Sequence, residues 1–324
     1  MSETLDLILQ TAEKLFSQHC NKELINQAEN GQFADDLWQE IEETGLLLAG
    51  VPEHYDGIGG DIADFFRLLE LAGKHCIPLP LAETYIARLA LHEAGIDIPD
   101  GPLSFAKAGT TIPFGRFVSG IVLWSEQELR YLPKSDHPVV KGYSYAGEAD
   151  DKIELGQNDG IILTTQHTIE WWQGLGALSR SSLMSGALGF MLDSSINYAL
   201  ERQQFGRPIA KFQAIQQQLA VLAGQYSQAR QATRVAAMNI SSKNFLHSVA
   251  VAKSVSGEAA GIGSEIAHQV LGAMGFTYEH DLHHRSRRLW SWRDQWGNET
   301  QWNIYLGKQL ASADPDKLWA LLTA

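Results

Sequence analysis

Five side chains between Arg202 and Gln213 have types and spacing that suit a phosphorylated nucleotide. Arg202 and Arg207 carry planar guanidinium groups, each of which can bond two oxygens of a phosphate or pyrophosphate at once. Gln204 and Gln213 carry amides that can bind a ribose or an adenine edge, and Phe205 lies between them in the sequence. The set therefore indicates an anion and nucleotide contact. Two surface helices with solvated Arg and Gln side chains would also explain the pattern, and the residue types leave that alternative open.

A break between two helices must position these side chains. The segment 198–219, YALERQQFGRPIAKFQAIQQQL, begins with a helical pattern, is interrupted at Gly206 and Pro208, and continues as a second helix rich in Gln and Ala. Proline lacks an amide hydrogen, clashes with the preceding helical turn and pushes Arg207 out of helical φ/ψ, while Gly206 supplies conformational freedom. The sequence therefore predicts a helical hairpin that carries the anion-binding residues around its bend.

The run RQQFGRPIAKFQAIQ, residues 202–216, closely resembles the signature of the acyl-CoA dehydrogenase family. These flavoenzymes desaturate CoA thioesters between Cα and Cβ. In that family the Arg and Gln that match Arg202 and Gln213 contact the FAD of a neighbouring subunit. The resemblance therefore implies FAD as the cofactor, and it implies that Gln204 and Phe205 belong to the same contact.

A second segment resembles the same family. Residues 269–277, QVLGAMGFT, are similar to its Gln-Val-x-Gly-Gly-x-Gly-Tyr motif, in which the Gln and the backbone approach the adenosine half of FAD. Gly272 and Gly275 would leave room for a ligand against main-chain amides, and Ala273 departs from the motif's second glycine. Alone, GAMG is an ordinary helix end. Together with the Arg202 segment, it implies that Gln269, Gly272, Ala273 and Gly275 bind the cofactor.

The base that removes the substrate α-proton is missing from both positions at which the resemblance places it. In the family this base is the Glu of a Glu-Gly-Thr motif, and a count without gaps from Thr277 puts that motif on Trp296, Gly297 and Asn298. Some relatives carry the base on the helix before the Arg-x-Gln-Phe-Gly motif, and that position falls near Gly176. Neither side chain can accept a proton, so the catalytic residue stays unknown. The nearest acids, each of which needs a register shift, are Glu170, Asp294 and Glu299.

A basic patch follows, in a chain whose formal net charge is −13: His280-Asp-Leu-His283-His284-Arg285-Ser-Arg287-Arg288. Three histidines this close could bind a metal ion, but Arg287 and Arg288 would repel a cation, so we predict no metal site. A contact for flavin or CoA phosphates and a salt-bridged interface are two interpretations of the patch. A partly solvated helix turn is the third.

Composition limits the class of protein. The chain has 324 residues, 44% hydrophobic and 19% charged, which suits one large or two ordinary globular domains. The acidic net charge argues against a nucleic-acid partner. Neither a signal peptide nor a run of transmembrane length is recognisable, and Cys20 and Cys76 form no metal or redox motif. These features predict a cytoplasmic protein with reduced thiols and no membrane partner.

Periodicity divides the chain into three predicted domains. Residues 1–98 repeat apolar residues at helical spacing, with Asp61 as a predicted helix cap, and form an N-terminal helical domain. Residues 99–168 carry short apolar runs, and Asn158-Asp159-Gly160 between two of them predicts a β-hairpin in a reduced β domain. The family's usual Thr-Glu and Gly-Ser-Asp flavin contacts are not recognisable there. Residues 169–324 carry long apolar stripes and predict a C-terminal four-helix bundle, which completes a mainly α acyl-CoA dehydrogenase fold with a small β region.

One predicted bundle helix contains three glycines, at positions 257, 261 and 263. Each costs up to about 1 kcal/mol relative to alanine, and we expect close contact between helices to compensate. Its expected buried stripe is Val251, Val255, Ala259, Ile262, Ile266 and Val270.

The resemblance implies removal of an α-proton by a base and transfer of a hydride from Cβ to flavin. Short members with a reduced β domain and no base resemble the partner subunits of heteromeric acyl-CoA dehydrogenases acting on steroid side-chain CoA esters. We interpret the chain as such a subunit, which binds FAD and acyl-CoA in a heterotetramer with a homologous chain. Two alternatives stay open. One is a self-sufficient homo-oligomer with an unconventional base such as Glu170 or Asp294, and the other is a non-catalytic scaffold without flavin.

Overall fold

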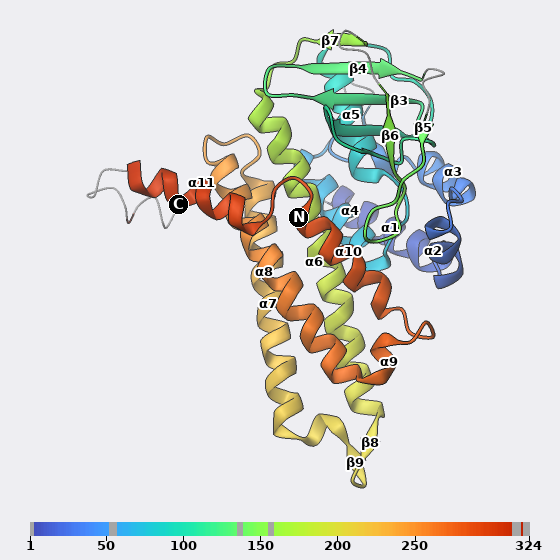
Figure 1. Ribbon diagram of the computed structural model, residues 1–324, viewed down its shortest axis with the longest axis vertical. Helices are drawn as coiled ribbons and strands as arrows, with labels where there is room; N and C mark the ends of the chain where they lie inside the picture. The colour runs from blue at the N-terminus through green and yellow to red at the C-terminus, as the bar shows by residue number, and fades with distance from the viewer. Residues whose placement is uncertain (1–2, 52–56, 135–138, 155–158, 313–318, 320–324) are drawn as a thin grey trace. The chain divides into compact units, whose positions relative to one another are not determined.

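The computed structural model describes residues 3–51, 57–134, 139–154, 159–312 and 319 (Figure 1). The chain forms two compact units, residues 1–176 and residues 177–324. Helices and the strands β1 to β7 belong to the first unit, and helices and a short two-stranded hairpin belong to the second. The finer division into three domains stays a prediction.

Helices open the first unit. In order they are α1 (Glu3–His19), α2 (Lys22–Glu29), α3 (Asp35–Glu43), the 3-10 turn η1 (Leu46–Leu48), α4 (Ile62–His75) and α5 (Leu81–Glu93). The predicted cap of α4 is confirmed, because the Asp61 carboxylate accepts the N–H of Ala63 while Asp64 accepts the N–H of Asp61. Phe65 of α4 stacks on Tyr85 of α5 with ring centroids 3.6 Å apart, which ties these two helices together.

Residues 103–163 form two small sheets. One has the strand order β1 (Leu103–Lys107), β3 (Gly120–Trp124), β4 (Leu129–Pro133) and β7 (Ile161–Leu163), and the other has the order β2 (Ile112–Pro113), β6 (Asp150–Ile153) and β5 (Val139–Val140). β1 and β3 are parallel, with Leu103 opposite Gly120, and the other pairs are antiparallel. Ile112, Leu123 and Leu132 from both sheets share one apolar core. The predicted small β region is confirmed.

The hairpin predicted around residues 158–160 is wrong. β6, before it, pairs with β2 and β5, whereas β7, after it, pairs with β4. The reason is a buried ion pair: Asp151 of β6 is fully buried and accepts hydrogen bonds from Arg116, at 2.5 Å from Nη2, and from the N–H of Gly142. A buried carboxylate needs such partners, so β6 is fixed beside them rather than beside β7. Asn158 itself lies outside the described residues.

The second unit is the predicted helical bundle. α6 (Ile169–Glu201) runs into it from the first unit, and α7 (Gln213–Met238), α8 (Phe245–Leu271) and α10 (Leu282–Asp294) lie along α6 in Figure 1. The short α9 (Ala273–Phe276) follows α8, and α11 (Glu299–Ser312) packs on α8. A Cβ on Gly263 of α8 would lie 2.6 Å from Leu188 Cδ2 of α6, which confirms the close helix contact expected there. Across the described residues, no helix has both the length and the apolar character needed to span a membrane.

The buried face of α8 differs from the predicted stripe. Ala259 and Val270 are buried, but the four branched residues of the stripe are only half buried: Val251, Val255, Ile262 and Ile266. Small and polar side chains occupy the buried face instead, among them Lys253, Ser256, Gly263 and Ser264. Closely spaced helix backbones leave no room for branched side chains, so hydrophobic periodicity identifies the wrong face of this helix.

Candidate functional site

The predicted break after α6 is a two-stranded hairpin. β8 (Gln203–Gln204) pairs antiparallel with β9 (Arg207–Pro208), and the 3-10 turn η3 (Ile209–Lys211) leads into α7. Phe205 and Gly206 form the bend, with φ of +52° and +76°. At the base of the hairpin, the carbonyl of Arg202 accepts the N–H of Ile209 at 2.8 Å. The connection predicted between two helices is therefore present, and its backbone is extended.

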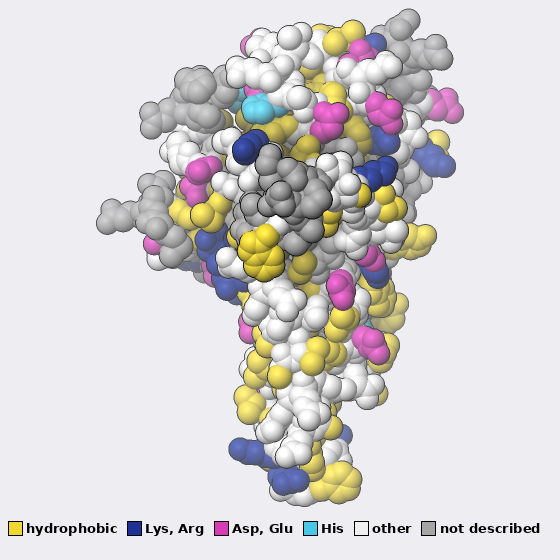
Figure 2. Space-filling view, turned by 90° about the vertical axis from the view of Figure 1, so that its left-hand side faces the viewer, with side chains coloured by type: hydrophobic (Ala, Val, Ile, Leu, Met, Phe, Trp, Pro, Cys, Tyr) yellow, Lys and Arg dark blue, Asp and Glu magenta, His cyan; other side chains and the backbone are white. Residues whose placement is uncertain are grey.

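The side chains of this hairpin face solvent. Arg202, Gln204 and Arg207 are exposed, and Phe205 is 93% exposed. Figure 2 shows Lys and Arg side chains beside apolar ones at the lower end of the bundle, where Figure 1 places β8 and β9. None of the described acidic residues forms an ion pair with Arg202. The hairpin therefore offers a cation and an aromatic ring to a ligand or to another chain.

Two ring contacts fix the end of the hairpin. The Phe205 ring meets the edge of the Phe212 ring at 6.2 Å between centroids, and the Arg207 guanidinium lies 4.4 Å from the Phe212 centroid. Phe205 nevertheless has a left-handed backbone, which costs an L-residue roughly 1–2 kcal/mol. A bulky residue at such a position is uncommon, and strain of this kind gathers at functional sites.

The second predicted group lies at the end of α8. Gln269 is exposed in the last turn of α8, and Gly272 follows with φ +58° and ψ −136°. No atom lies within 4 Å of the place where a Gly272 Cβ would stand, whereas Gly275 in α9 is buried and packs against Leu282. Ala273 begins α9 and is exposed. Gly272 therefore leaves an open approach to the main chain, as expected of a ligand contact.

The structure keeps the two groups of predicted cofactor residues apart. Both lie toward the lower end of the bundle in Figure 1, one in the β8–β9 hairpin and the other at α9. Within the described ranges, no hydrogen bond, ion pair or ring contact joins them.

Neither expected base position carries a base. Trp296 follows α10, is half buried and has φ +62°, and Gly176 is buried within α6. Of the alternative acids, Glu170 and Asp294 are exposed. Glu299 accepts a hydrogen bond from Arg293 Nε at 3.0 Å, and this bond lowers the pKa of Glu299, which weakens it as a base.

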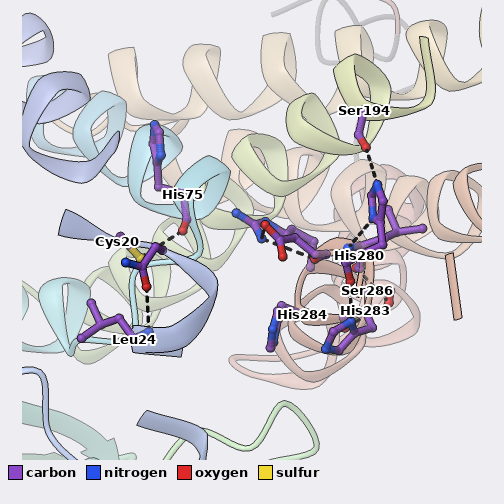
Figure 3. A network of polar contacts seen from close by, with 12 residues as sticks. Cys20, Leu24, His75, Ser194, His280, His283, His284 and Ser286 are labelled. Carbon is purple, nitrogen blue, oxygen red and sulfur yellow. Dashed lines mark hydrogen bonds and ion pairs between the residues drawn. The ribbon is translucent and has the colours of Figure 1, made fainter. Parts of the chain in front are cut away.

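Much of the basic patch is buried, and Figure 3 shows that His280, His283 and His284 lie close together in the second unit. His280 Nε2 lies 3.4 Å from Ser194 Oγ of α6, and the Arg285 guanidinium lies 3.9 Å from the ring of Phe190. His284, Arg285 and Arg288 are buried, so the interpretation as a partly solvated turn is wrong for them. No group of three or more His, Cys, Asp or Glu side chains could hold a metal ion in the part of the chain that the structure describes. A role in phosphate binding stays a prediction.

Sequence reasoning missed the buried Lys253 of α8. Its side chain is fully buried and donates hydrogen bonds to the carbonyls of Trp292 and Arg293, the last full turn of α10. The available signal was one charge inside the apolar run SVAVAKSVSG, residues 248–257, because a lysine there is buried only when its ammonium finds acceptors.

Two family models match the chain. Residues 2–97 match the acyl-CoA dehydrogenase N-terminal domain, and residues 175–293 match the acyl-CoA dehydrogenase C-terminal domain. A Bacillus subtilis protein named probable acyl-CoA dehydrogenase YngJ is 36% identical over 350 aligned residues, which cover 84% of this chain and 90% of the relative. The chain belongs to the acyl-CoA dehydrogenase family. The resemblance read from the Arg202 and Gln269 segments is thereby confirmed, and family members are flavin-dependent oxidoreductases.

Other acyl-CoA dehydrogenases agree with this assignment. Acyl-CoA dehydrogenase IpdE2 of Mycolicibacterium smegmatis is 28% identical over 290 residues, covering 87% of this chain and 91% of the relative. The ChsE4-ChsE5 complex from Mycobacterium tuberculosis superposes with a TM-score of 0.87 at 20% identity, over 97% of this chain and 99% of that one. A variant of the Tcur3481-Tcur3483 steroid acyl-CoA dehydrogenase gives 0.86 at 20% identity, over 95% and 98%. These two structures confirm the predicted acyl-CoA dehydrogenase fold.

Proposed function

We propose that this chain is an FAD-binding subunit of a heteromeric acyl-CoA dehydrogenase, and that a homologous partner supplies the catalytic base. The observation that carries the proposal is the β8–β9 hairpin. Its residues that match the family's flavin contacts, Arg202, Gln204 and Phe205, are exposed at one end of the bundle. A side chain that faces outward in this way is placed to touch a cofactor held by a neighbouring chain.

The residues present fit a flavin dinucleotide. Arg202 presents an exposed guanidinium, whose fork suits a pyrophosphate. Gln213, the first residue of α7, and Gln269 present exposed amides, and Gly272 leaves open space beside the main chain. Bound FAD supplies the acceptor for the hydride that leaves the β-carbon of the acyl group. This chain's own residues would bind and orient the two halves of that cofactor.

This chain has no side chain that can accept the substrate α-proton at either expected base position, Trp296 or Gly176. A general base must lie within hydrogen-bond distance of the proton that it removes, and neither an indole nor a glycine can do this work. Losing a positioned base typically costs about 10²–10⁴ in rate. We therefore assign the base and the productive acyl pocket to the partner, and we expect slow turnover from this chain alone.

The substrate that we propose is a steroid side-chain or other bulky acyl-CoA. Two similar structures support a heteromer of this kind, because one is described as a ChsE4-ChsE5 complex and the other as a Tcur3481-Tcur3483 steroid acyl-CoA dehydrogenase. The likeness in sequence to short family members without a base points the same way.

The cytoplasm is the compartment that we propose. Neither Cys20 nor Cys76 forms a disulfide within the described residues, and the Cys20 thiol donates a hydrogen bond to the carbonyl of His75 at 3.3 Å (Figure 3). A thiol that donates a hydrogen bond is reduced, and reduced cysteines are typical of cytoplasmic proteins.

The first test is flavin retention by Arg202→Ala. A hydrogen bond to a charged group contributes about 1.5–3 kcal/mol, so FAD should bind about 10- to 150-fold more weakly. Lys211→Ala is the matched control, because it removes the same charge from an exposed position in η3 and should leave FAD binding unchanged. Flavin absorbance per chain and a far-UV spectrum separate cofactor loss from misfolding. Equal flavin content in Arg202→Ala and the parent would contradict the proposal.

The second test decides between the proposal and its two alternatives. Flavin content and acyl-CoA turnover are measured for the chain purified alone and purified with a co-expressed homologous subunit. The proposal expects ordinary turnover only with the partner. Ordinary turnover by the single chain, abolished by Glu170→Gln or Asp294→Asn, would instead show a self-sufficient enzyme. A colourless protein in both preparations would show a scaffold subunit.

A further inference from the structure

The α9 segment, residues 272–278, connects α8 to α10 at the lower end of the bundle in Figure 1. Its helix has four residues, and one backbone hydrogen bond closes the first turn, from the N–H of Gly275 to the carbonyl of Gly272 at 3.1 Å. Phe276 is 73% exposed, and Gly275 is the one buried residue of this helix. A helix this short is not stable by itself, so contacts with α8 and α10 must hold it in place.

His268, in the last turn of α8, makes contacts of this kind. Its ring centroid lies 4.6 Å from that of Phe276, and a Cβ built on Gly275 would lie 3.2 Å from its Nδ1. On the side of α10, its Nε2 lies 3.1 Å from Ser286 Oγ, and its ring stacks toward Trp290 with 6.5 Å between centroids. One imidazole therefore packs against α9 and is hydrogen-bonded to α10.

The hydrogen bonds around His268 favour an uncharged imidazole. The Ser286 hydroxyl has one proton, and two carbonyls of its own helix lie close to it, that of Leu282 at 3.3 Å and that of His283 at 3.2 Å. When the hydroxyl donates to one of them, its oxygen accepts from His268, which places the proton of the neutral imidazole on Nε2. Nδ1 is buried, and no described group forms a hydrogen bond with it. A second proton would therefore create a buried N–H without an acceptor.

The charges around His268 act in the same direction. α9 and residues 213–225 of α7, which packs along α8, contain no ionisable side chain, and α10 presents the hydroxyl and the indole already described. Glu265, the nearest acid on α8 itself, is exposed to solvent. Burial, and after it the charge of His280 in the connection from α9 to α10, lower the pKa of His268. The Phe276 ring would attract a cation, but attraction at so exposed a ring is weaker than the cost of a buried donor without an acceptor.

We infer that His268 fixes the α9 segment in a pH-dependent manner: its neutral imidazole holds residues 272–278 against α8 and α10, and uptake of a proton in mild acid releases them. In the released state both ring nitrogens face water, and burial no longer opposes the charge. That state binds a proton at the ordinary histidine pKa of about 6.5, whereas the fixed state resists it. Acid therefore favours release, and the change begins below about pH 6.5.

The consequence for the cofactor rests on the proposed function. Gln269, Gly272, Ala273 and Gly275 are the residues expected to contact the adenosine half of FAD, and all but the first lie in the α9 segment. Release of the segment removes these contacts. The chain should therefore hold FAD at neutral pH and lose it in mild acid.

Hydrogen exchange of the full chain as purified, followed by mass spectrometry at about pH 7.5 and about pH 5.5, tests the release. His268→Gln is the decisive variant, because its amide can still donate to Ser286 and cannot take up a proton. At the acid pH, residues 272–281 should exchange at least about fivefold faster in the parent than in His268→Gln, the smallest factor expected from an unpaired buried donor. At the neutral pH the two should exchange alike. Comparison at one pH removes the intrinsic effect of pH on exchange.

Two further variants serve as controls. His268→Phe keeps a ring beside Phe276 and cannot be charged, so it should also exchange slowly in acid, and it replaces His268→Gln if that variant does not fold. His247→Gln removes a histidine from the first turn of α8, where Nδ1 lies 3.0 Å from Gln309 Oε1, and it should behave as the parent does. Equal exchange by the parent and His268→Gln in acid would overturn the inference. A rise in the parent that spreads over the whole of α8 would overturn it as well.

Flavin release tests the consequence separately from the proposed function. At about pH 5.5 the parent should bind FAD at least about fivefold more weakly than His268→Gln, as measured by the fluorescence of released flavin, and at about pH 7.5 the two should be equal. Equal affinity in acid, beside a difference in exchange, would show that the α9 segment does not hold the cofactor. A parent that retains no flavin at either pH, alone or with a partner, contradicts the proposed function, and the exchange measurement still decides the role of His268.

Discussion

The β8–β9 hairpin and the turn at residues 295–297 each place an aromatic residue in the left-handed region, with φ +52° for Phe205 and +62° for Trp296. Their surroundings are opposite. Phe205 is 93% exposed and meets only the edge of Phe212 among the described aromatic rings, whereas Trp296 is half buried in a turn held from three other helices. The same left-handed backbone conformation therefore carries an exposed ring in the hairpin, whereas in the turn it is held by hydrogen bonds from neighbouring helices.

The two regions also differ in what they retain from the family. The hairpin keeps the residue types that match the flavin contacts, and its chemistry is available at the surface. The turn keeps a rigid backbone, but a side chain that cannot take a proton stands where the base is expected. Under the proposed function, this subunit has lost one half of the reaction while the framework for that half persists, because rigidity and chemistry come from different residues.

The pH dependence of stability should distinguish the two regions most strongly. Burial lowers the pKa of Lys253 from 10.5 to about 7. Between about pH 7 and pH 10 the unfolded chain therefore binds a proton that the folded chain lacks, and the free energy of unfolding rises with pH. The expected rise from pH 7 to pH 9 is about 2 kcal/mol. Urea unfolding at the two pH values should show this rise in the parent and in Arg202→Ala, and should not show it in Lys253→Met. An undiminished rise in Lys253→Met would show that the lysine is not the titrating group.

Asparagine at the two left-handed positions should have opposite effects. Asparagine tolerates positive φ better than an aromatic residue does, so Phe205→Asn should raise the free energy of unfolding by about 1 kcal/mol. Trp296→Asn gains the same relief but loses a half-buried indole, and we expect a net loss of about 1 kcal/mol. Denaturant unfolding at one fixed pH measures both variants. Shifts of the same sign would mean that the turn is no better packed than the hairpin.

Alanine substitutions at two glycines of α8 should give the smallest difference in the free energy of unfolding. A Cβ on Gly257 would lie 2.8 Å from Glu299 Oε2, so Glu299 would have to move away from Arg293, whereas a Cβ on Gly261 meets only Arg293 Nη1, at 3.6 Å. Gly261→Ala should therefore gain about 0.5–1 kcal/mol from helix propensity. Gly257→Ala should gain nothing, because the lost ion pair offsets it. Thermal unfolding of both variants under the same conditions measures these changes in stability. An equal gain in stability for Gly261→Ala and Gly257→Ala would show that Glu299 does not support the turn.

The sequence predicts most helices because their signals are local. The cap at Asp61 and the apolar spacing after it are enough to predict α4. α2 gives no such signal, because Ile25 is the one buried residue among its eight and a single residue makes no stripe. The strand partners of β6 depend on Asp151 meeting Arg116, 35 residues away, and no local pattern contains that contact.

The two candidate regions also differ in whether their contacts are local in the sequence. The hairpin residues are contiguous, so one run of sequence predicts where Arg202, Gln204 and Phe205 gather. The turn at Trp296 depends on Arg180 and Lys253, which lie 115 and 39 residues from their partners in the chain. The resemblance implies that a base is missing at Trp296, and only the fold shows what holds the turn.

The exposed hairpin has a consequence for proteolysis. Trypsin cleaves after arginine or lysine but not where proline follows, so the bond after Arg207 is resistant, and the bonds after Arg202 and Lys211 are open to attack. In the isolated chain both bonds lie in an exposed segment between two long helices, and brief digestion should cut there first. A neighbouring chain that covers the hairpin would protect them. The pattern of fragments would then report assembly directly, without substrate and without any measurement of colour.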